Sequence, residues 1–422
     1  MPSPRFSVAA ALLGTLLTAA ACGSSRAGGF DDPATAPAPT APAGDLGTSG
    51  GPPKDPTGIG SLVGTVFAPE GTVPISNALL YLSPSMPAPL APGVFCDKCV
   101  ELPAGTPYTY SKADGTFKLP VYTAGDQYLV VQKGHFRRAR PLKVAAGDAS
   151  IPGVLTTLPG APDPAKGDEI PRIGVTFGGF DKIELSLMKL GIKSFDRYGK
   201  DPFFDPKGLP PSVGQPNDLL NAPEKLAQYH IVLLPCALGG LSCGAPSAPQ
   251  KDNLRNFVSA GGKLYVTDYS YEYVNQTWPG FITWKDKTGN DMNANSAYGA
   301  ACQDAAYTKP GTADDPGLAS WLGAIGEKSF DLKDSWTIIS KVNPMPGKDP
   351  DGKPVTVTPK VWMTSNGTGP STVSFDNQCG RVLFSTYHAE GGEADALLAQ
   401  EKALLFILLE VGVCVGQQPP PR

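Results

Sequence analysis

Short apolar runs separated by turn-forming residues follow one another between residues 59 and 158, which is typical of an all-β domain. The runs cover residues 62–67, 78–82, 116–119 and 128–132. Asp114 and Gly115 come directly before the third run, and an Asp-Gly pair tolerates the positive φ angles that a tight hairpin turn needs. The pattern therefore predicts a small all-β sandwich over residues 59–158.

From residue 170 to about 415, apolar strands alternate with amphipathic helices. Strand-like runs cover residues 172–177, 229–234, 263–267 and 381–386, and helix-like segments cover residues 181–190, 254–258 and 396–409. In the first helix, apolar side chains at Ile183, Leu187 and Leu190 have the spacing of one helical face. This alternation predicts an α/β domain with a flavodoxin-like, mostly parallel sheet and helices on both faces. An irregular insertion is expected over about residues 275–375.

The N-terminus has the pattern of an export signal. Arg5 gives a short positive region, residues 6–17 are apolar but too few to span a membrane, and three alanines precede Cys22. The arrangement resembles a bacterial lipoprotein signal. This resemblance implies a signal peptide over residues 1–21, lipidation of Cys22 and, because Gly23 follows instead of aspartate, delivery to the outer membrane. A plain secretory signal with an incidental cysteine is the alternative.

A proline- and glycine-rich stretch follows the expected cleavage site. The chain holds 45 prolines and 49 glycines among 422 residues, and residues 22–58 consist largely of proline, alanine, glycine and threonine. Such a composition cannot bury a hydrophobic core and behaves as a partly extended chain. We therefore expect a tether that holds the two domains away from the lipid anchor.

Charge and hydropathy exclude two classes of function. The formal net charge is −4, only 18% of residues are charged, and no basic block could neutralise several phosphates. Nucleic-acid binding is therefore not expected. No run of 18 or more apolar residues occurs, so no transmembrane helix is expected. The expected location is the cell envelope, with the N-terminal lipid in the membrane.

The all-β region carries a family resemblance. The stretches GTVFAPEGTVPISNALLYL, SKADGTFKLP and AGDQYLVVQKGHF occur in this order and are similar to the carboxypeptidase regulatory-like (transthyretin-like) domain. The resemblance covers most of residues 59–147 and implies a non-catalytic β-sandwich that binds or spaces. This chain departs from the family by an insertion over about residues 83–108.

One group of basic residues occurs at the end of this region. Its members are Lys133, His135, Arg137, Arg138, Arg140 and Lys143. They could contact anionic glycans or lipid headgroups. The favoured interpretation is the solvated face of an edge strand, where charge prevents aggregation.

The cysteines predict disulfides, because an exported chain folds in an oxidising compartment. Cys96 and Cys99 form a CxxC in the proline-rich insertion, and no second CxxC or HxxxH supplies further zinc ligands. We expect a local disulfide there, with half of a metal site or a redox pair as alternatives. Cys236 and Cys243 flank a proline- and glycine-containing loop and form a second expected pair.

The third expected pair is Cys379–Cys414, which follows from βα geometry. Cys379 comes just before the last strand, and Cys414 comes just after the helix that follows it. The strand advances about 23 Å and the helix returns about 25 Å, so the two cysteines should approach within disulfide distance. Cys302 would then remain unpaired in the insertion.

The second domain also carries a resemblance. The stretches YHIVLLPC, NLRNFVSAGGKLYVTD and GRVLFSTYHAE, followed by a closing helix, resemble the class I glutamine amidotransferase-like fold over most of residues 171–412. In that family the last core strand ends in His-Pro-Glu, which supplies a base and its orienting carboxylate. His388 and Glu390 keep this spacing, with Ala389 between them. The resemblance implies that His388 is the base and Glu390 its partner.

The family nucleophile is not recognisable. Its place, directly after the strand over residues 263–267, holds Asp268 and then Ser270, and neither has small residues two positions to each side, as a nucleophile elbow needs. Asp268 is a poor substitute for a thiolate in amide hydrolysis. His388 is then a satisfied polar residue at the sheet edge, a ligand- or metal-binding group together with Asp268 and Glu390, or a hydrolytic base. All three residues follow strand ends, where open α/β sheets bind ligands.

The sequence favours a non-catalytic, lipid-anchored envelope protein that binds another envelope protein or a glycan. No cofactor and no metal site are expected. One alternative is an envelope amidase or peptidase that uses His388 and Glu390. The other is a receptor for a small ligand or a metal at the strand ends. A Ser270 hydroxyl or Cys236 thiol within hydrogen-bond reach of His388 would favour the enzyme.

Overall fold

The computed structural model describes residues 58–389 and 396–409, except residues 98, 104 and 203–204. The expected signal peptide, Cys22, nearly all of the tether, Glu390 and Cys414 lie outside the described residues. Within the described part of the chain, no helix is long and apolar enough to cross a membrane.

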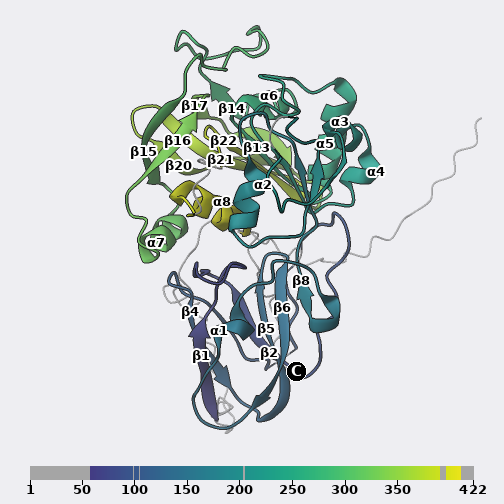
Figure 1. Ribbon diagram of the computed structural model, residues 1–422, viewed down its shortest axis with the longest axis vertical. Helices are drawn as coiled ribbons and strands as arrows, with labels where there is room; N and C mark the ends of the chain where they lie inside the picture. The colour runs from purple at the N-terminus through teal and green to yellow at the C-terminus, as the bar shows by residue number, and fades with distance from the viewer. Residues whose placement is uncertain (1–57, 98, 104, 203–204, 390–395, 410–422) are drawn as a thin grey trace, which may run out of the picture. The chain divides into compact units, whose positions relative to one another are not determined.

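The first part of the described chain contains two β-sheets (Figure 1). The three-stranded sheet has the order β4 (Thr116–Val121), β1 (Gly60–Thr65) and β7 (Ala149–Ser150). The five-stranded sheet has the order β3 (Tyr108–Tyr110), β2 (Leu79–Ser83), β5 (Gly125–Lys133), β6 (Phe136–Val144) and β8 (Asp168–Glu169). Two short helices, α1 (Gly153–Thr156) and η1 (Pro164–Lys166), precede β8. Every apolar run predicted as a strand in this region forms one.

Alternation of side chains explains these strands. In β4, Phe117, Leu119 and Val121 are buried while Lys118 is exposed, as expected for a strand with one face on a core. Gly115 has a φ of +76° in the turn before β4. The predicted Asp-Gly turn is therefore confirmed.

The basic cluster is not a solvated edge, and that expectation is wrong. β8 covers the edge of β6, and its two carboxylates pair with arginines of β6. Asp168 Oδ1 lies 2.8 Å from Arg138 Nε, and Asp168 Oδ2 lies 2.6 Å from Arg140 Nη2. Arg137 Nε donates to Glu169 over 2.6 Å. The sequence prediction missed this arrangement because the carboxylates follow the arginines by about 30 residues, in the stretch between the two predicted domains.

The second part is built on a ten-stranded sheet. Its strand order is β11 (Ser212–Gly214), β10 (Asp196–Tyr198), β9 (Ile173–Thr176), β12 (Ile231–Leu234), β13 (Lys263–Thr267), β22 (Gly380–Ser385), β21 (Gly369–Asn377), β20 (Lys360–Ser365), β15 (Tyr307–Ala313) and β16 (Phe330–Ser335). The strands from β11 to β22 are parallel, and those from β22 to β16 are antiparallel. The α/β class is confirmed, but the sheet is mixed.

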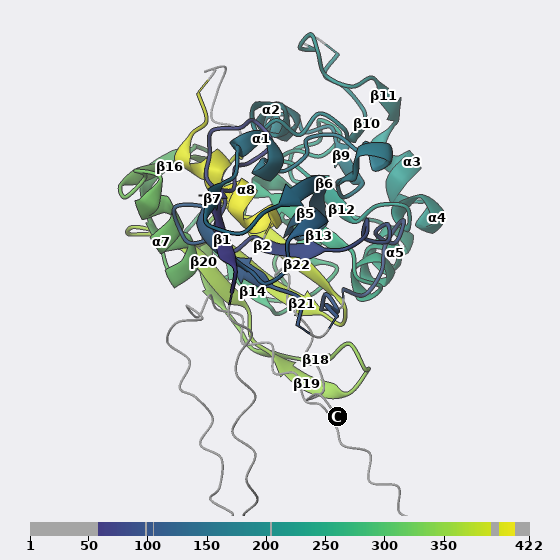
Figure 2. The same cartoon turned by 90° about the horizontal axis from the view of Figure 1, so that it is seen from below.

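The antiparallel half comes from the segment over residues 275–375, which we expected to be irregular. It contributes four strands to the central sheet and two small antiparallel sheets outside it. One of these sheets pairs β14 (Ile282–Trp284) with β17 (Ile339–Val342), and the other is a hairpin of β18 (Met345–Lys348) and β19 (Pro354–Val357). Figure 2 shows β18 and β19 extending beyond the sheet. The turns that join β20, β21 and β22 are too short for a crossover, so these strands pair antiparallel.

Helices pack against the parallel half. They are α2 (Ile183–Lys189), α3 (Pro216–Leu220), α4 (Pro223–Leu226) and α5 (Ala248–Ser259), while α6 (Glu272–Asn275) follows β13. The helix α8 (Ala399–Leu409) packs against β16 and α7 (Pro316–Ala324) of the antiparallel half. Ser186 of α2 donates to Glu401 of α8 over 2.9 Å, so these two helices lie side by side (Figure 1).

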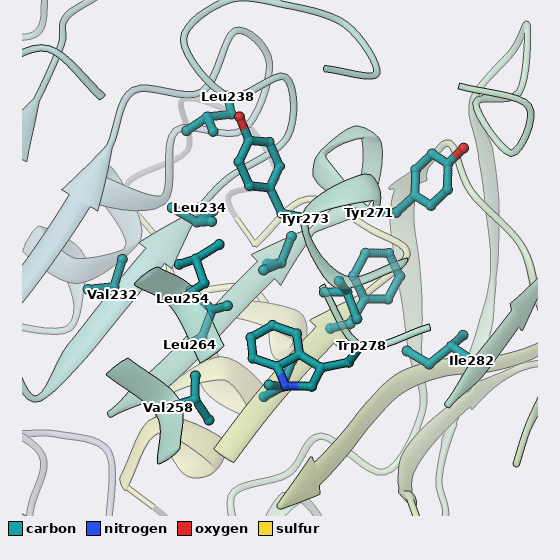
Figure 3. Close-up of a cluster of buried hydrophobic side chains, with 14 of the residues drawn as sticks. Val232, Leu234, Leu238, Leu254, Val258, Leu264, Tyr271, Tyr273, Trp278 and Ile282 are labelled. Carbon is teal, nitrogen blue, oxygen red and sulfur yellow. The ribbon is translucent and has the colours of Figure 1, made fainter. Parts of the chain in front are cut away.

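The helix α5 packs against alternate residues of the parallel strands. Figure 3 shows Leu254 and Val258 of α5 against Val232, Leu234 and Leu264. The same cluster extends to aromatic residues that follow β13, namely Tyr271, Tyr273 and Trp278. The cluster therefore joins the predicted α/β elements to the start of the inserted segment.

The predicted disulfide pairs are wrong. Cys96 is bonded to Cys379, with Cα atoms 4.9 Å apart, and Cys243 is bonded to Cys302, with Cα atoms 6.4 Å apart. Cys99 is also disulfide-bonded. Cys236 is a free, buried thiol.

The physical reason is that both bonds join segments that sequence analysis treated as independent. The loop before β3 reaches the turn before β22, and the inserted segment folds back onto the loop after β12. A pairing rule based on closeness in sequence, or on the geometry of one βα unit, could not reveal that these distant segments come together.

A polar cluster lies beside the Cys96–Cys379 bond. Asp97 Oδ1 lies 2.6 Å from Nε2 of His135, which follows β5, and Asp97 Oδ2 lies 3.1 Å from Nζ of Lys263 in β13. Trp321 of α7 donates its indole N–H to the carbonyl of Pro74 over 2.7 Å. The all-β region and the α/β region are thus joined by covalent, ionic and hydrogen-bonded contacts.

Candidate functional site

Three neighbouring parallel strands end at the same edge of the central sheet, and a chemically reactive side chain follows each. Cys236 follows β12, Asp268 follows β13 and His388 follows β22. Their ligand-type atoms, one sulfur, one carboxylate oxygen and one imidazole nitrogen, all lie within 4.8 Å of one another. All three residues are buried. The structure therefore places Asp268 and His388 close together, as the strand-end rule predicted, and it places Cys236 beside them.

Asp268 has the backbone of a nucleophile elbow, although its neighbours lack the elbow pattern. Its φ is +47°, and the chain passes from β13 through the short helix η2 (Asp268–Ser270) into α6. Aspartate is one of the few residue types that tolerate the left-handed region. The residue that adopts this positive φ, directly after β13, is a carboxylic acid.

The carboxyl group of Asp268 is enclosed. The backbone N–H of Trp336 donates to both of its oxygens, over 3.1 and 3.0 Å. Burial raises the pKa of Asp268 well above its ordinary value, and the neighbouring carboxylates of Asp181 and Asp334 add to this. The strand-end site is thus closed by the loop after β16.

His388 and Cys236 are close but not hydrogen-bonded to each other. Nε2 of His388 has no hydrogen-bond partner among the described residues, and it lies 3.6 Å from Oδ2 of Asp268. Burial, with a contribution from the Asp268 carboxylate, raises the pKa of the Cys236 thiol far above its ordinary value. A thiol in such surroundings is inert, because the thiolate is the nucleophilic form.

Ser270 is not available as a nucleophile either. Its hydroxyl donates to the carbonyl of Pro235 over 2.7 Å and accepts from the N–H of Leu238 over 3.1 Å. It therefore fixes the loop that follows β12.

Asp181 and Thr267 hold the site together. The Thr267 hydroxyl donates to Asp181 Oδ2 over 2.8 Å and accepts from the N–H of Cys236 over 2.8 Å. The same Asp181 oxygen accepts from the N–H of Ala389 over 3.0 Å. Sequence analysis did not single out Asp181, and it named Cys236 only as a thiol that would favour an enzyme if it lay near His388, while expecting it to pair with Cys243. The sequence signal that could have placed Cys236 in this site was its position directly after a buried strand, β12, which neighbours the strand that precedes Asp268.

A separate cavity of about 560 Å³ lies at the opposite end of the parallel strands. Its lining includes Pro92 and Gly93 from the loop of the all-β region and Arg172, Gln228 and His230 from the α/β region. Arg172 Nη2 lies 2.9 Å from Asp196 Oδ2, so the charged groups of the lining pair with each other.

No protein-family profile and no curated protein matches the chain. Cytoplasmic protein STM3548 from Salmonella typhimurium is similar at 10% identity and a TM-score of 0.34, over 57% of this chain and 98% of that chain. A putative ThuA-like protein from Bacteroides uniformis gives 11% identity and a TM-score of 0.32, over 56% of this chain and 89% of that chain.

The GH42 beta-galactosidase Gan42B of G. stearothermophilus, in the form of a catalytic mutant, is similar at 13% identity and a TM-score of 0.31, over 58% of this chain. The match spans only 30% of that enzyme's length. At TM-scores this low, none of these similarities assigns a function.

Proposed function

We propose that this chain is a non-catalytic, lipid-anchored protein of the bacterial cell envelope that acts as a tethered binding or scaffolding module. In this proposal the first part is a carboxypeptidase regulatory-like sandwich and the second a degenerate amidotransferase-like domain. The observation that carries the proposal is the state of Asp268, which follows β13 where the resembled family has its nucleophile: the residue is fully buried and is capped by the N–H of Trp336.

The chemistry of the neighbouring groups supports the same conclusion. Hydrolysis of an amide needs a nucleophile within hydrogen-bond reach of a base. His388 Nε2 has no such partner in the described part of the chain, and burial disfavours the thiolate of Cys236. An amidase or peptidase using His388 and Glu390 is therefore less well supported than a binding role.

Alkylation of Cys236 tests the absence of catalysis. We expect iodoacetamide to leave Cys236 unmodified in the native protein, in buffer that contains a metal chelator, and to modify Cys236 after denaturation. The same labelling of His388→Gln shows whether the imidazole activates the thiol. Rapid native labelling of Cys236 that is lost in His388→Gln would show a working thiol–imidazole pair and overturn the proposal.

Cell fractionation tests the anchor. We expect Cys22→Ser to move the protein from the membrane to the soluble periplasmic fraction, because it removes the lipidated residue. Cys236→Ser is the control, since it changes a cysteine without touching the signal. Unchanged membrane association of Cys22→Ser would contradict the anchor.

The cavity beside Arg172 is where we propose that a glycan or protein segment binds. Its volume of about 560 Å³ lies within the range of ligand pockets. A photo-crosslinking residue at the exposed position Gln228 should capture an envelope partner, whereas the same residue at exposed Lys287 should not. Equal crosslinking from both positions would contradict this placement.

A further inference from the structure

We propose that Cys236, Asp268 and His388 form a binding site for a divalent metal ion of the zinc class. This inference is independent of the proposed envelope role, and it concerns residues that neither the disulfides nor the packing of the fold requires in this combination.

The geometry of the three side chains fits such an ion. In a tetrahedral zinc site, neighbouring ligand atoms are about 3.3–3.6 Å apart, given bond lengths of about 2.0–2.3 Å. His388 Nε2 and Asp268 Oδ2 lie 3.6 Å apart, and the sulfur of Cys236 lies within 4.8 Å of both ligand atoms. A small rotation of the side chains would bring all three atoms onto one ion.

An unpartnered polar atom points into this cluster. His388 is 7% exposed, and its Nε2 has no hydrogen-bond partner among the described residues. A buried polar nitrogen without a partner is unfavourable in the folded state. A metal ion would remove that cost, because Nε2 would donate its lone pair to the ion.

The donor set selects the class of ion. Sulfur, imidazole nitrogen and carboxylate oxygen together suit zinc and related transition metals, whereas magnesium and calcium prefer oxygen ligands alone. Cys236 is the free thiol of the described chain, where the other described cysteines are disulfide-bonded. Three protein ligands leave one coordination position for water or a small ligand.

The backbone around the cluster fixes the ligands in place. The Thr267 hydroxyl holds the N–H of Cys236, the Gln400 amide donates to the carbonyl of His388 over 2.8 Å, and the N–H of Trp336 holds the carboxylate of Asp268. Because the three ligands follow adjacent strands of one sheet, their backbones are positioned without metal. The site would bind an ion with little rearrangement of the chain.

The experiment uses the purified full chain with its disulfides intact. After chelator treatment and addition of Zn²⁺, we expect about one zinc per chain by elemental analysis, as a single mononuclear site requires. Co²⁺ should give the cobalt–thiolate absorption band of a cysteine ligand. Cys236→Ser and His388→Gln should each lower zinc affinity by more than about tenfold. Asp304→Asn, which changes an exposed carboxylate elsewhere, should bind zinc as the unmodified chain does.

The outcomes separate folding from binding. Circular dichroism of each variant shows whether it folds. Zinc should raise the thermal midpoint of the unmodified chain and of Asp304→Asn, but not of Cys236→Ser or His388→Gln. Failure of the unmodified chain to give either a bound zinc or a cobalt–thiolate band would overturn the proposal whatever the variants do. Zinc binding that survives in Cys236→Ser would do the same.

Discussion

Cys96 and Cys379 are joined by a disulfide, although 283 residues separate them in sequence. Cys96 lies in the loop before β3 of the all-β region, and Cys379 lies in the turn before β22 of the central sheet. The neighbouring Asp97 contacts Lys263 of β13. The loop between β2 and β3 therefore joins the all-β region to the α/β region.

Removal of this disulfide should destabilise the protein strongly. We expect replacement of Cys96 and Cys379 by serine to lower the free energy of unfolding by about 3–5 kcal/mol, because the bond closes a very long loop in the unfolded chain. The matched control replaces Cys243 and Cys302, which are 59 residues apart. The loop-length dependence predicts a loss smaller by about 1.4 kcal/mol for that pair. Denaturant unfolding measures both, and an equal or reversed order would contradict the prediction.

Asp97 should contribute more to stability than an exposed ion pair does. Burial opposes its ionisation, but the hydrogen bonds and charges of His135 and Lys263 lower the pKa of Asp97 well below its ordinary value. Asp97→Asn should cost about 1–3 kcal/mol, since it leaves the Lys263 charge poorly paired. Asp304→Asn, which removes an exposed partner of Lys287, should cost at most about 1 kcal/mol. Thermal unfolding at neutral pH compares the two variants, and equal losses would contradict the prediction.

Stability should fall on mild acidification because of His230. Its Nδ1 accepts from the N–H of Arg172 over 2.8 Å, and Nε2 lies 3.2 Å from the carbonyl of Ala91. The neutral ring satisfies both contacts. Burial, followed by the charge of His135, lowers the pKa of His230 from 6.5 to about 4.

The sign follows from proton binding. The unfolded state binds a proton at His230 more tightly than the folded state does, so the stabilisation is complete above pH 6.5 and is lost as the pH falls towards 4. His230→Asn should keep an acceptor for the Arg172 N–H and show a shallower loss of stability over this range. Denaturant unfolding at a series of pH values measures the slope, and an unchanged slope in the variant would contradict the assignment.

Gly261 should not tolerate a side chain. Its φ is +118°, and a Cβ there would lie 1.9 Å from the carbonyl oxygen of Phe95. Gly261→Ala should therefore cost about 2–4 kcal/mol. Gly71 has a φ of +92° but open space around it, so Gly71→Ala should cost about 1 kcal/mol from backbone strain alone. Thermal unfolding that shows equal losses would mean that the loop around Phe95 moves away freely.

Local sequence patterns determined those strands and helices of the fold that lie outside residues 275–375. The runs at 231–234 and 263–267 form strands, and the apolar segment ending at residue 409 forms α8, because periodicity and turn residues act within a few positions. The strand-end rule also placed Asp268 and His388 at one edge of the sheet, because parallel neighbours end together. These features depend on spacing that can be read along the chain.

Only the tertiary structure decided which distant segments meet. The partners of Cys96 and Cys243, the ion pairs of β6 with Asp168, and the strands supplied by residues 275–375 all depend on contacts between residues far apart in sequence. The same holds for Cys236, whose thiol is free because its expected partner is bonded elsewhere. Residue type and local spacing carry no information on such encounters, since they are set by how the sheets and loops pack in three dimensions.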